Sequence, residues 1–239
     1  MLRLSNMSIL PCRFLKLRND FPPCVSCLFG QARRRLWRHK SSTTSTDGVL
    51  LNADITKPGQ RVGTDQIVSA QPGLVPKEKG QMTRARIWGA TVFVDYASRL
   101  VKIHIMIDET GESTLEAKNA FERDCMTRNV VPKHYHADNG RFTENSFKED
   151  CVRKMQNLTF YGVGAHHQNG VSERIIKDLT LSSRTLVLHA QLHWPEYITT
   201  MSFPFALVAA VDIMNNLHVD MHGQTPEMNF SNTIGYRIN

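Results

Sequence analysis

The chain has 239 residues, of which 41% are hydrophobic and 21% charged, a composition typical of a globular protein with a buried core. The apolar run FPFALVAAV (203–211) is nine residues long, about half of the roughly 18 residues that cross a bilayer, so we expect no membrane span. Residues 1–60 hold 10 Lys/Arg and 3 Asp/Glu, which favours contact with a polyanion but equally describes a poorly ordered basic tail.

The N-terminal region carries two of the five cysteines, Cys24 and Cys27, in PPCVSCLFGQARRRLWR (22–38). An odd number of cysteines without regular spacing argues against a disulfide framework and predicts an intracellular protein. A single C-x-x-C pair supplies only two of the four ligands that a structural zinc ion needs. Residues 41–48 are polar and without periodicity, so they are expected to form a linker.

Three strand-like runs come next, at 61–70, 87–97 and 100–108, with a Pro/Gly-rich connecting loop at 71–86. A helix is expected over 113–128, where Ser113 and Glu116 have the spacing of a helix-start capping box. The first strand-like run contains Asp65 and the second contains Asp95.

The second half alternates strands and helices. Short strands are expected within 130–140 and at 157–163, and helices at 143–155, 168–190 and 203–216. This order predicts an α/β fold with a mixed sheet covered by helices on both faces.

Two acids stand at positions suited to chemistry. Asp138 follows a strand and precedes Asn-Gly in HADNGRF (136–142), and Glu173 lies in the first turn of the long helix, 35 positions later. Taken alone, Asp138 is more often a turn residue and Glu173 more often a partner of the helix dipole.

Taken together, HADNGRF and AHHQNGVSERIIKDL (165–179) resemble the D,D-35-E catalytic core of retroviral and retrotransposon integrases, and HHQNG resembles the Ty1/copia branch. The resemblance covers about residues 58–230. It implies a ribonuclease H-like fold with a five-stranded mixed sheet and helices on both faces, after a poorly ordered basic N-terminal segment.

The resemblance also selects the first catalytic acid. Integrases take it from the first strand, which matches VGTDQIVSA (62–70), whereas VFVDYASR (92–99) resembles the second strand and its turn. We therefore assign the first acid to Asp65 and expect Asp95 to bond nearby backbone or Arg99.

The implied cofactor is a pair of Mg²⁺ or Mn²⁺ ions, which are hard cations that prefer carboxylate oxygens. Asp65, Asp138 and Glu173 would be the catalytic and metal-binding residues. The resemblance also implies that five residues around Glu173 contact DNA: His167, Asn169, Gly170, Arg174 and Lys177. Lys177 could equally form an ion pair with Glu173, four residues before it on the helix.

Cys24 and Cys27 match the second half of the family's His-His-Cys-Cys zinc module, but residues 1–23 contain no His. We expect no stable zinc site, and the following organisation: a truncated zinc-module remnant and linker, largely disordered, at 1–50; a catalytic core at 55–230; and a tail at 231–239. The missing histidines and the stop at Asn239 predict a fragment of a retrotransposon polyprotein.

The resemblance implies an integrase core that joins element DNA 3′ ends to target DNA, works as a homo-oligomer and acts in the nucleus or in a cytoplasmic particle. A non-catalytic nucleic-acid-binding remnant of a decayed element is the main alternative. A ribonuclease H proper would share the acids, but has no reason to carry HHQNGVSER.

Overall fold

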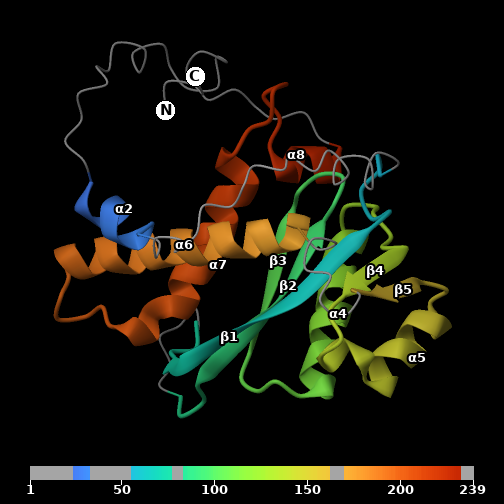
Figure 1. The fold of residues 1–239 in the computed structure, drawn as a ribbon, viewed down its shortest axis with the longest axis horizontal. Helices are drawn as coiled ribbons and strands as arrows, with labels where there is room; N and C mark the ends of the chain where they lie inside the picture. The colour runs from blue at the N-terminus through green and yellow to red at the C-terminus, as the bar shows by residue number, and fades with distance from the viewer. Residues whose placement is uncertain (1–23, 33–54, 77–82, 162–169, 233–239) are drawn as a thin grey trace, which may run out of the picture.

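The computed structural model describes residues 24–32, 55–76, 83–161 and 170–232. Within these ranges the chain forms one five-stranded mixed sheet in the order β3-β2-β1-β4-β5 (Figure 1). The strands are β1 (Val62–Gly73), β2 (Ile87–Asp95), β3 (Val101–Met106), β4 (His134–Ala137) and β5 (Asn157–Phe160). The expected mixed sheet is confirmed.

The sheet has an antiparallel half and a parallel half. Strand β2 runs antiparallel to both β1 and β3, so these strands form a meander. Strands β1, β4 and β5 run parallel, and each parallel step is made by a crossover through a helix. The carboxyl ends of parallel strands meet at one edge, where binding sites commonly form.

Helices cover both faces of the sheet, as expected from the sequence (Figure 1). One face packs on α4 (Gly111–Met126) and α5 (Asn145–Arg153) through a core that includes the stacked rings of Phe93 and Phe121. The other face of β1, β2 and β3 packs on α6 (Gly170–His193) and α7 (Phe203–Leu217) through aliphatic side chains such as Val92 and Leu207. Helix α8 (Pro226–Ser231) follows α7.

Helix α4 begins earlier than the sequence predicts. The capping residue is Thr110, whose hydroxyl accepts a hydrogen bond from the Ser113 N–H. The predicted Ser113 cap is therefore wrong by one turn, because Asp108 and Thr110 already bond the first helical residues.

Helix α7 with its preceding turn, Thr200–Leu217, is long and apolar enough for a membrane span by length and composition. The helix itself was expected at 203–216, but no membrane span was expected from its nine-residue apolar run, and the preceding turn brings the apolar window to 18 residues. Its inner side, including Leu207, Ala210 and Met214, is buried against the sheet and α6. Packing in the core accounts for this buried side only, because 44% of the window is buried and apolar side chains such as Phe205 and Leu217 remain exposed.

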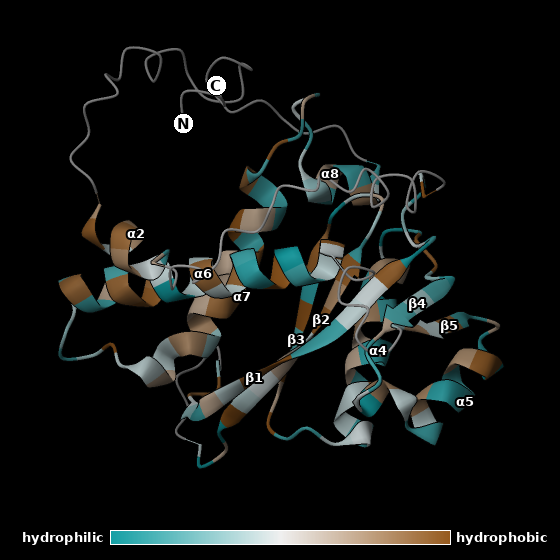
Figure 2. Cartoon of the chain, viewed as in Figure 1, coloured by the Kyte–Doolittle hydropathy of each residue, from teal (hydrophilic) through white to brown (hydrophobic). Residues whose placement is uncertain are grey.

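Part of the N-terminal segment that was expected to be disordered forms helix α2 (Val25–Gly30). This helix lies against α6, where Gly30 approaches Thr185 so closely that a Cβ would stand 2.7 Å from its Cα. Apolar residues gather on α2 and on the last turns of α6 (Figure 2). The sequence did not show this, because the apolar partner is more than 150 residues away.

Candidate active site

Two carboxylates stand side by side on neighbouring parallel strands. The register pairs Thr64 with Ala137, so Asp65 on β1 is adjacent to Asp138, the first residue after β4. Both acids are half-buried. Asp138 accepts a hydrogen bond from the Gly140 N–H at 3.2 Å, which fixes the turn that follows the strand. The sequence prediction that Asp138 stands at a strand end is confirmed.

The start of α6 is brought to this strand edge by a close approach. Gly63, two residues before Asp65, faces Ser172 of α6 and the ring of Tyr96, and a Cβ there would stand 2.6 Å from Tyr96 Cε1 and nearer still to Ser172 Oγ. The Tyr96 and Ser172 hydroxyls share a hydrogen bond of 3.4 Å. Glu173 is the next residue and lies in the first helical turn, as predicted.

The three acids interact electrostatically. Burial, followed by the carboxylates of Asp138 and Glu173, raises the pKa of Asp65 from 3.8 to about 6, although a hydrogen bond from the Gln66 N–H at 2.8 Å opposes this. Among the described residues, no group of three or more His, Cys, Asp and Glu side chains is close enough to hold one metal ion.

Asp95 is a structural residue, as the sequence led us to expect. Its carboxylate is 1% exposed and accepts hydrogen bonds from the N–H of Gly59, the N–H of Ser98 and the hydroxyl of Ser98, at 2.8, 2.8 and 2.7 Å. Its two oxygens thus hold the turn between β2 and β3 and the segment that leads into β1. The same acid could not also bind a ligand without breaking this turn.

Helix α6 presents further polar groups next to the acids. Glu173, Arg174 and Lys177 are exposed and line one surface hollow with Gly170. Lys177 thus lies on the same side of the helix as Glu173, as its spacing predicts. The predicted DNA-contact residues His167 and Asn169 lie outside the described residues.

Cys24 and Cys27 lie at the start of α2 and are exposed. They contact each other, and the backbone and thiol of Cys27 lower the pKa of the Cys24 thiol. The pair is on the α2 side of α6, and the linker that was expected to join this region to the core lies outside the described residues.

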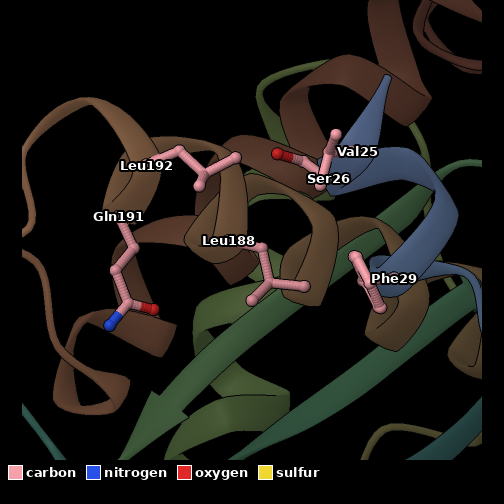
Figure 3. Close-up of a pocket in the computed structure, with 6 residues that line it drawn as sticks. All are labelled: Val25, Ser26, Phe29, Leu188, Gln191 and Leu192. Carbon is pink, nitrogen blue, oxygen red and sulfur yellow. The ribbon is translucent and has the colours of Figure 1, made fainter. Parts of the chain in front are cut away.

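The apolar pocket between α2 and α6 has a volume of about 250 Å³ and is shown in Figure 3. Its described lining residues are mostly apolar and carry no charge. It is lined by Val25, Ser26, Phe29, Leu188, Gln191 and Leu192.

Several residues around the acids were not singled out from the sequence. Tyr161, just after β5, donates a hydrogen bond from its hydroxyl to the carbonyl of His136 at 3.0 Å and lies near Asp65. Gly63, Tyr96 and Ser172 join α6 to β1. The only available signal was alternation along the strands, which places Gly63 and Asp65 on one face.

Comparisons with known proteins support the fold. A chain of the simian T-cell lymphotropic virus intasome in complex with PP2A regulatory subunit B56 gamma superimposes with a TM-score of 0.54 at 19% identity, over 73% of this chain and 55% of that chain. The present chain therefore spans little more than half of that relative. The HTLV-2 integrase catalytic core domain in complex with magnesium (dimeric form) gives 0.48 at 20% identity, over 73% of this chain and 97% of that chain.

The catalytic core domain of BIV integrase gives a TM-score of 0.49 at 18% identity, over 73% of this chain and 95% of that chain. No protein-family model and no curated protein sequence matches the chain. The five-stranded mixed sheet with its helices thus shares its fold with the chain of the simian T-cell lymphotropic virus intasome.

Proposed function

We propose that this chain is an integrase-type polynucleotidyl transferase core that joins DNA 3′ ends to target DNA. The observation that carries the proposal is that Asp65 on β1 lies within electrostatic reach of Asp138 after β4 and of Glu173 on α6. Burial, and then these two carboxylates, raise the pKa of Asp65 to about 6. These are the acids that the resemblance to D,D-35-E integrases selects in the sequence. The shared fold supports the same conclusion.

The donor set fits Mg²⁺ or Mn²⁺. Carboxylate oxygens are the ligands that these ions prefer. Burial is the main reason for the raised pKa of Asp65, and cations would relieve the repulsion that Asp138 and Glu173 add to it. Asp65 and Asp138 would hold one ion, and Asp65 and Glu173 the other, so no group of three acids is needed at either. Bound ions supply Lewis-acid stabilisation of the attacking and leaving oxygens.

In the proposed reaction, a DNA 3′-hydroxyl oxygen forms a bond to the phosphorus of a target phosphodiester, whose 3′ oxygen leaves with the electron pair of the broken bond. No Ser or Cys nucleophile of the protein takes part. Arg174 and Lys177 are exposed beside Glu173, where their positive charges would attract DNA phosphates. His167, Asn169 and Gly170 would form the lead-in to the reacting DNA end.

The wider assignment is to a Ty1/copia-type polyprotein fragment that acts as a homo-oligomer in the nucleus or in a cytoplasmic particle. HHQNGVSER (166–174) supports the Ty1/copia type. The intasome and the dimeric HTLV-2 core among the similar structures favour an oligomer that binds DNA.

The test is strand transfer, or its reversal on branched DNA, by the purified chain with Mn²⁺. We expect metal-dependent products that the Asp138→Asn variant lacks, because that variant loses one carboxylate of the acid pair. The DNA products are resolved on a denaturing gel. Equal product from both proteins would contradict the proposal.

The assignment of the first acid has a separate test. Asp65→Asn is expected to abolish turnover at unchanged stability or better. Asp95→Asn is expected to lower stability, because its turn loses a charged acceptor, while the folded fraction keeps its turnover. Turnover that survives in Asp65→Asn and disappears in folded Asp95→Asn would show the alignment to be wrong.

One observation favours a second function, that of a non-catalytic nucleic-acid-binding remnant. No three potential ligands of one ion converge in the described parts of the chain. DNA retention without turnover in the assay above would support this function. Any zinc role of Cys24 and Cys27 would also require ligands beyond the pair.

A further inference from the structure

The face of the sheet that carries the acids has a second group of polar side chains. Side chains two residues apart on a strand share a face, and the β1–β4 and β4–β5 registers align these positions across three strands. The registers align Gly63, His136 and Thr159 across the three strands, and His134 with Asn157. Continuing the alternation by two residues brings in Asp65, Asp138 and Tyr161 at the end that carries the acids, and Arg61 beside His134 at the other end.

This part of the sheet has a polar surface rather than an apolar core. The aliphatic cluster under α6 and α7 draws its strand residues from β1, β2 and β3, and none from the described residues of β4 or β5. Strand β4 is correspondingly hydrophilic in Figure 2. A polar sheet face adjoining a candidate active site is suited to a polar ligand.

A hydrogen-bonded chain runs across the outer strands. The Thr159 hydroxyl lies 2.7 Å from His134 Nε2 and 2.7 Å from His136 Nδ1, so it accepts from one ring and donates to the other. His136 is 5% exposed, and its Nε2 has no hydrogen-bond partner among the described residues. A buried polar atom without a partner costs free energy, and a ligand atom would remove that cost.

Arg61 supplies the positive charge of this group. Its guanidinium lies 5.2 Å from the centre of the Tyr96 ring, and its buried Nε also lacks a partner within the described ranges. Burial and then the charge of Arg61 lower the pKa of both histidines, that of His136 to about 4. The imidazoles are therefore neutral at pH 7 and serve as hydrogen-bonding groups beside a single cation.

We propose that Arg61, His134 and His136 form a subsite for a non-reacting backbone phosphate of the DNA bound at the acids. A planar guanidinium with adjacent N–H donors matches the oxygens of a phosphate. Arg61 precedes Asp65 by four residues, which is about 13 Å along a strand, so the subsite holds a phosphate on the same face but away from the reacting one. The position of this phosphate relative to the reacting phosphate rests on the proposed function.

The test measures DNA binding without metal, so it does not depend on catalysis. A short fluorescein-labelled DNA duplex is titrated with the full chain in EDTA, and fluorescence anisotropy is recorded over a series of salt concentrations. Arg61→Ala is expected to weaken binding on the order of tenfold and to reduce the salt slope by about one.

Arg153→Ala is the matched control. It removes the same charge from α5, on the opposite face of the sheet, where Arg153 is 72% exposed and pairs with Asp150. It is expected to bind DNA as the unaltered chain does. Equal affinity and slope for Arg61→Ala and the unaltered chain, or an equal loss in Arg153→Ala, would overturn the subsite.

Two further variants keep the outcome interpretable. His134→Ala removes a half-buried ring without removing a charge, and is expected to weaken binding with no change in salt slope. Unchanged binding by a folded His134→Ala, judged by its unfolding midpoint, counts against the subsite. Asp138→Asn is expected to bind DNA while lacking turnover. If the unaltered chain also lacks turnover, the proposed function fails. If Arg61→Ala then still binds DNA more weakly than the unaltered chain, the subsite stands without that function.

Discussion

Asp65 places a carboxylate where the fold disfavours its charge. Its pKa of about 6 in the folded chain lies above its ordinary value of 3.8. A group whose pKa is raised by folding destabilises the fold once it ionises, so the penalty is absent below about pH 4, grows as the pH rises to 6 and is constant above that.

Asp65→Asn is therefore expected to raise the free energy of unfolding at pH 8 by on the order of 1 to 2 kcal/mol and to leave it unchanged at pH 4. Urea unfolding at the two pH values measures the difference. Asp212→Asn, at an exposed position on α7, is the control and should show no such pH dependence. If the unaltered chain were more stable than Asp65→Asn at pH 8, the raised pKa of Asp65 would be contradicted.

At the same scale, the sequence predicts where the candidate acids lie in the fold but not the contacts that hold them there. Local patterns predict that Asp138 stands at a strand end, Glu173 at a helix start and Asp95 at a turn, whereas their selection as site or structural residues came from the resemblance to integrases. The contacts of Gly63 with Ser172 and Tyr96 join segments that are more than 30 residues apart in the chain. No local pattern encodes such contacts, because they arise only after the sheet and α6 pack.

Helices α4 and α5 are joined by a buried charged network. Lys118 is fully buried and bonds Glu122, Asp150 and the side-chain oxygen of Gln156. Burial would raise the pKa of Asp150, but hydrogen bonds from Lys118 and neighbouring cations lower it to about 2. The network therefore stabilises the fold above pH 4, and this contribution is lost as the pH falls toward 2.

Lys118→Met is expected to lower the free energy of unfolding at pH 7 by about 3 kcal/mol, because it removes the one fully buried cation of the network and leaves Glu122 and Asp150 to the more exposed Lys154 and Arg153. Chemical denaturation measures the loss. Lys148→Met, an equal change at an exposed position of α5, should change stability by no more than about 0.5 kcal/mol. Similar losses in both variants would show that the network contributes little.

The order and type of the main elements could be predicted from the sequence, but their ends could not. The Ser113–Glu116 pair has the capping spacing, yet Thr110 caps α4 because Asp108 bonds the first turn. Helix α2 was missed for a different reason. Its six residues have no stable helical pattern of their own and depend on α6.

Over the whole molecule, divalent ions should act as ligands of the native state. Mn²⁺ at a hundredfold excess over its dissociation constant is expected to stabilise the chain by about 2.7 kcal/mol, because only the folded sheet brings the acids together. Thermal unfolding with and without Mn²⁺ measures the effect. Asp65→Asn and Asp138→Asn should lose it, whereas Asp108→Asn, at an exposed acid away from the site, should retain it. Equal stabilisation of all four proteins would place the ion elsewhere.

The parallel pairing of β1 with β4 joins residues that are far apart in the chain, such as Thr64 and Ala137. Long-range pairings of this kind form late, because the intervening chain must first be closed into a loop. During synthesis, Asp65 leaves the ribosome well before Asp138 and Glu173. A nascent or half-folded chain therefore carries Asp65 apart from the other two acids, and the proposed site is assembled only when β1 pairs with β4.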